Sequence, residues 1–183
     1  MSRIPIPATI GDAPVASQPL LEGVKTQLGV VPNLFRLVAT SPAALQGYLG
    51  LFGALGNGAL PAATRARIAL AVAEINGCDY CLSAHTYLGK NLAKLDDAEI
   101  AANRSGGSHD ARADAAVRFA AKVARERGHV SEDDFRAVKR AGYDDAQVIE
   151  IVLHVALNTW TNYMSVVAKT DIDFPLVSAR KAA

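Results

Sequence analysis

Residues that start and stop helices recur along the whole chain, and they constrain its fold more than any other feature. Ser41-Pro42 fits a helix N-cap followed by proline at the first helical position, and Gly29 and Gly142 are suited to end helices. No good run of alternating β-branched residues lies between turn signals. The sequence therefore predicts an all-α fold. We expect helices at about residues 17–29, 33–39, 41–56, 61–75, 78–94, a short one from 96, and then 110–127, 131–142 and 144–169.

The chain has 183 residues, which is enough for one domain with a core of its own. We expect an extended N-terminal arm over residues 1–15, which carry Pro5, Pro7 and Pro14, and a single helical domain over residues 16–183. The net charge of +1 gives no electrostatic reason to expect nucleic acid or an anionic membrane as a partner. No apolar run is long enough to span a membrane, and the first residues lack the layout of a signal peptide, so we expect a cytoplasmic protein.

Both cysteines of the chain lie in one short segment, Glu74-Ile-Asn-Gly-Cys78-Asp-Tyr-Cys81-Leu-Ser-Ala-His85. Cys81 and His85 are four residues apart, so their side chains can meet on one face of the expected helix. If Asn76-Gly77 ends the preceding helix, both cysteines lie at a helix N-terminus, where the helix dipole lowers a thiol pKa. The carboxylate of Glu74 could orient His85 or relay a proton. The segment predicts thiol redox chemistry.

Other roles for these residues stay open at this point. The two cysteines could be inert buried side chains. Glu74, Cys78, Cys81 and His85 together could bind zinc, although zinc sites usually collect ligands from two separated segments. His85 could also be an ordinary core histidine. The thiol interpretation is favoured because the pair accounts for all the cysteines and has a histidine one turn away; it needs no metal and no cofactor.

The segment Asn-Gly-Cys-x-x-Cys-x-x-Ala-His resembles the AhpD-like alkylhydroperoxidase branch of the carboxymuconolactone decarboxylase family. The best match spans about residues 60–95. Val31-Pro-Asn-Leu-Phe35 and Trp160-Thr-Asn-Tyr163 also look like the peroxidase-related members, so the resemblance extends more weakly over most of the chain.

The resemblance implies an all-helical AhpD-like domain that assembles into trimers or hexamers. It implies a thiol peroxidase with an antioxidant role, without metal or haem, that consumes a hydroperoxide and is reduced by an external thiol, dithiol or reductase protein. By the same resemblance, Cys81 is the peroxidatic cysteine, Cys78 resolves it, and His85 relays protons with an upstream glutamate.

Two positions depart from the best-known members of that family. They have a glutamate twelve residues before the first cysteine, where this chain has Ala66; Glu74, two turns later, is our candidate for its carboxylate. They also have a histidine just before the second cysteine, where this chain has Tyr80. Tyrosine can donate a hydrogen bond but does not titrate near neutral pH, so the proton relay can differ.

A stripe of polar residues in the last helix, His154, Asn158 and Asn162, recurs every four residues. These side chains could reach the active site or a subunit interface; ordinary hydrogen bonding between packed helices is the favoured alternative. Two other functions remain beside the peroxidase: a non-enzymatic redox-responsive or zinc-responsive module, and a decarboxylase-like acid–base enzyme that would not need the cysteines.

Overall fold

The structure is a computed structural model that describes residues 2–180, so Met1 and residues 181–183 lie outside the described part. Residues 2–180 contain helices and no strand, which confirms the all-α prediction. Two 3-10 turns, at Ile10–Asp12 and Val15–Ser17, precede the first α-helix. The α-helices are α1 Gln18–Leu28, α2 Asn33–Val38, α3 Pro42–Gly56, α4 Ala62–Ile75, α5 Asp79–Asn91, α6 Asp97–Arg104, α7 Ala111–Arg125, α8 Glu132–Arg140 and α9 Asp145–Ala168.

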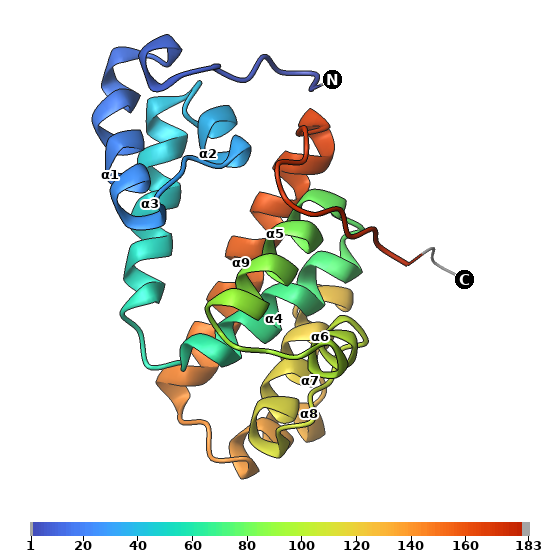
Figure 1. The fold of residues 1–183 in the computed structure, drawn as a ribbon. Helices are drawn as coiled ribbons and strands as arrows, with labels where there is room; N and C mark the ends of the chain where they lie inside the picture. Colours follow the sequence, from blue (N-terminus) through green and yellow to red (C-terminus); the bar gives the residue numbers. More distant parts are fainter. Residues whose placement is uncertain (1, 181–183) are drawn as a thin grey trace.

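Helix α4 is the centre of the larger group of helices, because α5, α6, α7 and α9 all pack against it (Figure 1). Its residues 68–73 are all buried, and three of the six are alanines, which let neighbouring helices approach closely. One hydrophobic core lies between α4, α7 and α9; a second joins α1, α2 and α3 to the start of α5. The cysteine segment therefore sits where the two groups of helices meet.

Most helix ends lie within a few residues of their predicted positions, because local capping decides them. Ser131 caps α8 with Asp134, and Asp144 caps α9 with Gln147, each pair forming a reciprocal capping box. Helix α5 is shorter than predicted: it ends at Asn91, and Lys94 adopts a left-handed conformation with φ of 56°. A non-glycine residue in that conformation cannot continue an α-helix.

Both ends of the described chain are held by α9 or α5. Near the N-terminus, the Arg3 N–H donates to the carbonyl of Ala168 at 2.6 Å, where α9 ends. After α9 the chain crosses α5 as an irregular segment, residues 170–180, which we call the C-terminal strap (Figure 1). Ser83 and Asp79 of α5 accept hydrogen bonds from its backbone at Val177 and Ala179, at 2.9 and 2.8 Å. The division into an arm and one domain stays a prediction.

In the described part of the chain, no helix is both long and apolar enough to cross a membrane.

Candidate active site

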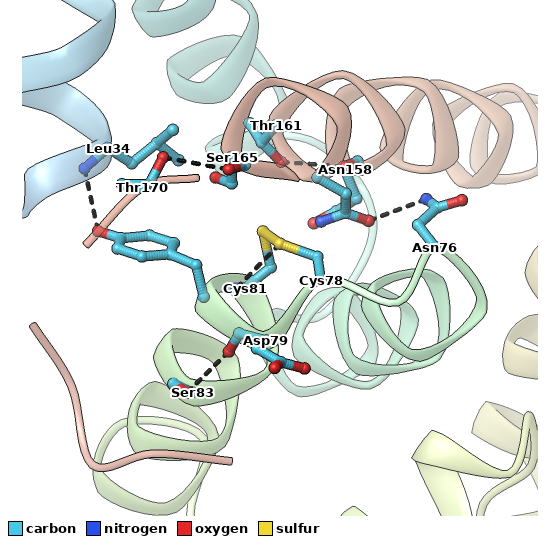
Figure 2. The surroundings of a disulfide bond; sticks show 12 residues. Leu34, Asn76, Cys78, Asp79, Cys81, Ser83, Asn158, Thr161, Ser165 and Thr170 are labelled. Atoms are coloured by element: carbon cyan, nitrogen blue, oxygen red, sulfur yellow. Dashed lines mark hydrogen bonds between the residues drawn. A yellow bond between two sulfur atoms is a disulfide. The ribbon is translucent and has the colours of Figure 1, made fainter. Parts of the chain in front are cut away.

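The cysteine pair lies at the first turn of α5, as the sequence predicts. Gly77, with φ of 63°, reverses the chain after α4, and Cys78 becomes the N-cap of α5. The Cys78 Sγ accepts a hydrogen bond from the Cys81 N–H at 3.2 Å, so a sulfur does the capping that an oxygen usually does. The two residues, with Cα atoms 5.3 Å apart, form a disulfide (Figure 2). Both are buried.

A hollow of about 270 Å³ opens between the start of α5 and the end of α9. Of the two cysteines, Cys78 lines it, together with Gly77 from the turn and Ser165 and Lys169 from α9 and its end. The hollow opens to solvent and reaches Cys78, a residue that is otherwise buried. A small thiol can therefore approach the disulfide from the Cys78 side.

His85 follows Cys81 by one helical turn and is half-buried. Burial lowers its pKa to about 4, and the Asn158 side chain offsets this in part by favouring the protonated imidazole. His85 is therefore neutral at pH 7. A neutral imidazole beside a thiol can accept its proton, so the geometry suits a general base.

Glu74 lies at the end of α4, but its carboxylate faces α6 and the C-terminal strap. Its Oε2 pairs with Arg104 Nε at 2.6 Å, and its Oε1 accepts a hydrogen bond from the Arg180 N–H at 2.7 Å. Within residues 2–180, both of its oxygens are engaged by these groups and no hydrogen bond joins it to His85. The structure thus bonds Cys78 to Cys81, places His85 one turn after Cys81 on α5, and directs Glu74 elsewhere.

The two positions that depart from the best-known AhpD members have structural contacts here. Ala66 packs against a small apolar cluster that includes Leu70 and Ile100. The Tyr80 hydroxyl accepts a hydrogen bond from the Leu34 N–H at 3.0 Å, and its ring meets the edge of Phe174. Burial raises the pKa of Tyr80, so it stays protonated. Tyr80 links α5 to α2.

The polar stripe of α9 is buried along its whole length and faces the cysteine segment. Figure 2 draws Asn158, Thr161 and Ser165 on the face of α9 that looks onto the disulfide. Asn162 Oδ1 accepts a hydrogen bond from Asn76 Nδ2 at 2.9 Å. The stripe therefore makes hydrogen bonds between packed segments, which was the favoured alternative, while Ser165, Val166 and Lys169 are the residues near the end of α9 that line the hollow. Sequence analysis missed Ser165, although it follows Asn162 by three residues and so shares its helical face.

His154, at the far end of the stripe, has a pKa lowered to about 4 by burial and by the nearby charge of Arg65. Its Nε2 has no hydrogen-bond partner among the described residues. The Asn158 Nδ2 donates to the His154 backbone carbonyl at 2.8 Å, and the Asn158 side chain also interacts with His85 of α5.

The four residues considered for zinc are not arranged as a metal site. Cys78 and Cys81 are bonded to each other, and Glu74 is paired with Arg104. Across residues 2–180, no three His, Cys, Asp or Glu side chains are grouped so that they could hold a metal ion.

Similar proteins share the fold over nearly the whole chain. A peroxidase-related protein from Ralstonia eutropha JMP134, described as an alkylhydroperoxidase AhpD core, is 27% identical with a TM-score of 0.83, covering 94% of this chain and 92% of its own. A peroxidase-related protein from Silicibacter sp. TM1040 is 26% identical with a TM-score of 0.77, covering 86% of this chain and 85% of its own. The debrominase Bmp8 shares the fold at 22% identity and a TM-score of 0.77, covering 92% of this chain and 91% of its own.

By sequence, no curated protein matches the chain significantly. Residues 42–126, which run from α3 to the end of α7 and include the cysteine segment, match the model of the carboxymuconolactone decarboxylase family. Together with the AhpD-like fold and its peroxidase-related neighbours, this match supports placing the chain in the carboxymuconolactone decarboxylase family, beside its AhpD-like members.

Proposed function

We propose that the protein is a thiol-dependent hydroperoxidase that works through a Cys78–Cys81 dithiol/disulfide cycle. One observation carries the proposal: the two cysteines are bonded at the N-terminus of α5, one turn from a neutral imidazole. The helix N-terminus favours a thiolate, and the imidazole can take the thiol proton. The peroxidase-related neighbours support the same class of activity.

The cycle begins with Cys81. His85 accepts the thiol proton, and the Cys81 thiolate attacks the terminal oxygen of a hydroperoxide ROOH, breaking the O–O bond. The proton held by His85 goes to the departing alkoxide, which leaves as the alcohol ROH, while Cys81 becomes a sulfenic acid. The Cys78 thiol then attacks the Cys81 sulfur, water leaves, and the disulfide forms. An external dithiol returns two electrons and two protons and is itself oxidised to a disulfide.

In this proposal Glu74 is a positioning residue and not the partner of His85. Its contacts with Arg104 and Arg180 hold α6 and the C-terminal strap against the end of α4. The sequence-based expectations of a homo-oligomer, a trimer or hexamer, and of a cytoplasmic location belong to the same proposal.

The test is hydroperoxide consumption in the presence of excess dithiol, with wild type compared with Cys81→Ser and Cys78→Ser. Organic hydroperoxides and hydrogen peroxide are both used as substrates. We expect no turnover from Cys81→Ser. Cys78→Ser should consume about one equivalent of peroxide and then stop, because it lacks the resolving thiol. Turnover by Cys81→Ser at the wild-type rate would overturn the assignment.

The likeness to a debrominase adds one substrate to this test. A dithiol can reduce a carbon–bromine bond: two electrons and one proton go to the carbon, which exchanges its bromine for hydrogen. Bromide and the second proton are released, and the two thiols become the disulfide. The debrominase Bmp8 is also known in complex with 2,3,4-tribromopyrrole, in a structure 21% identical to this chain. Incubation of the reduced protein with this compound, followed by bromide analysis, separates the two activities. Bromide release that needs both cysteines, without peroxide turnover, would replace the hydroperoxide by an aryl bromide as the substrate.

A further inference from the structure

Two buried hydrogen-bond donors near the disulfide have no partner among the described residues. They are the Ser165 hydroxyl and the Asn162 Nδ2 amide, whose residues are 3% and 0% exposed. Leaving a buried donor unpaired costs stability, and most buried polar groups in folded proteins avoid it. Two such donors on one face of α9, three residues apart, therefore need an explanation.

Their neighbours connect both donors to the cysteine pair. Asn162 is held through its Oδ1 by Asn76, which stands two residues before Cys78. Ser165 lines the same hollow as Cys78, and Figure 2 shows it on the side of α9 that looks onto the disulfide. A disulfide sulfur is a weak acceptor, whereas a thiolate in the same place carries a full negative charge and accepts strongly.

We propose that Ser165 and Asn162 donate hydrogen bonds to a thiolate that exists only when the Cys78–Cys81 pair is reduced. This inference rests on the proposed dithiol cycle and deepens it. In the disulfide form the two donors are unpaired; in the reduced form they donate to the thiolate and stabilise it. They are positioning residues that set how readily the disulfide is reduced and how much of the reduced pair is ionised.

The reduction step shows where they act. A thiolate of an external dithiol enters the hollow and attacks the Cys78 sulfur, forming a mixed disulfide, and Cys81 leaves as a thiolate. The second thiol of the reductant, once deprotonated, attacks the reductant sulfur that is bonded to Cys78 in the mixed disulfide. This releases Cys78 as a thiolate and oxidises the reductant to a cyclic disulfide. Both steps release a thiolate, and donors that bind it lower the barrier and favour reduction.

The substitution Ser165→Ala separates this role from a purely structural one. It removes an unpaired hydroxyl, so the oxidised protein should be at least as stable as wild type. If the hydroxyl serves the thiolate, the same change raises the pKa of the reduced pair by about one unit. The equilibrium with a dithiol then shifts about tenfold toward the disulfide, which corresponds to a reduction potential about 30 mV more negative.

The measurements are the thiolate ultraviolet absorbance against pH and the redox equilibrium of the full chain in dithiothreitol buffers. Ser17→Ala is the matched control, since Ser17 is equally buried but its hydroxyl donates to the Ala39 carbonyl at 2.7 Å, away from the cysteines. It should lower stability and leave the thiol pKa and the potential unchanged. Asn162→Leu, of similar size, should shift both quantities in the same direction as Ser165→Ala.

An unchanged thiol pKa and potential in Ser165→Ala and in Asn162→Leu, with both proteins folded, would overturn the inference. Shifts of equal size in Ser17→Ala would do so too, because they would then reflect general destabilisation. Neither measurement uses a peroxide. A failure of this inference is therefore distinct from a failure of the proposed peroxidase activity.

Discussion

In the proposed cycle, the half-buried imidazole of His85, one turn after Cys81, decides how protons move at the site. Burial disfavours the protonated imidazole, so His85 is neutral at pH 7 and can act as a base. It does not supply a positive charge to stabilise a thiolate. The thiolate must then be favoured by the helix N-terminus and by nearby donors. The side-chain amide of Asn158 interacts with His85 and also donates a hydrogen bond to the His154 backbone carbonyl.

We expect His85 to titrate with a midpoint near 4 in the folded protein, against an ordinary value of 6.5. A histidine side-chain NMR titration checks this, with His85→Phe used to assign the signal. Asn158→Leu should lower the midpoint further, because it removes the group that favours the protonated ring. A midpoint near 6.5 would contradict the burial argument.

The same shift makes the stability depend on pH. Between pH 6.5 and 4 the unfolded chain binds a proton at this site and the folded protein does not, so stability falls as the pH falls through that window. The loss attributable to His85 reaches about 3 kcal/mol at pH 4 or below.

At the scale of the elements, two partly buried ion pairs join helices that are distant in sequence. Glu74 of α4 pairs with Arg104 of α6, and Glu99 of α6 pairs with Arg67 of α4, each at 2.6 Å. The two pairs therefore cross between the same two helices in opposite directions. The Glu74 pair also holds the C-terminal strap through Arg180, whereas the Glu99 pair holds the loop before α7 through Ser108 and His109.

Glu74→Gln should destabilise the protein by about 2 kcal/mol, because it weakens the charge-assisted hydrogen bonds from Arg104 and from the Arg180 N–H. The rate at which peroxide oxidises Cys81 should change less than about twofold, since the carboxylate does not reach His85. Urea unfolding and single-turnover oxidation check the two parts. Glu99→Gln is the matched control. A large loss of rate in Glu74→Gln alone, at unchanged stability, would restore Glu74 to the proton relay.

The ionised carboxylate of Glu99 should contribute to the stability of the protein, and this contribution should be lost at low pH. Burial alone would raise the pKa of Glu99, but hydrogen bonds from Ser108, Asn103, His109 and Arg67 outweigh it and lower the pKa to about 2, from an ordinary value of 4.5. The ionised group stabilises the fold above pH 4.5 by about 3 kcal/mol, and this share is lost as the pH falls toward 2.

Urea unfolding of Glu99→Gln and wild type at pH 7 and pH 3 measures that share. The difference in unfolding free energy between wild type and Glu99→Gln should be roughly half as large at pH 3 as at pH 7. A difference that does not depend on pH would mean that packing, and not charge, explains it.

Local features of the elements were predictable from sequence, whereas long-range partners were not. Ser131, Asp144 and Gly77 act on their own neighbours, so helix ends and the position of Cys78 followed from the chain itself. The partners of Glu74 lie 30 and 106 residues away, and those of Tyr80 come from α2 and the C-terminal strap. Only the packing of the whole chain shows that the Glu74 carboxylate faces Arg104 and the C-terminal strap.

At the scale of the molecule, α9 leaves an apolar face uncovered. Its exposed large side chains recur at helical spacing, and Ile149 and Val167 near its two ends are 67% and 59% exposed. Exposed apolar faces of this kind mark interaction sites in soluble proteins. The face thus suits the homo-oligomer proposed above. Its remaining members are Val152, Leu153, Trp160 and Tyr163.

We expect Ile149→Glu to shift the protein toward smaller assemblies, since a buried unpaired charge opposes association. Sedimentation velocity over a range of concentrations measures the change. Val15→Glu is the control, because Val15 is exposed at 81% but lies outside α9. Equal masses for Ile149→Glu and wild type at every concentration would remove this face from the interface.

The two ends of the described chain clasp the helices that carry the site. Arg3 holds the end of α9, and Ala179 holds Asp79 at the first position of α5, next to Cys78. Between them, Asp173 of the strap accepts a hydrogen bond from the Asn33 N–H at 2.7 Å and so fastens α2 to the same bundle. Residues near both ends of the described chain are therefore bonded to the helices that carry the candidate active site. We expect an affinity tag or fusion partner at either end to disturb these contacts, so the reactivity of the cysteine pair should depend on where the tag is attached.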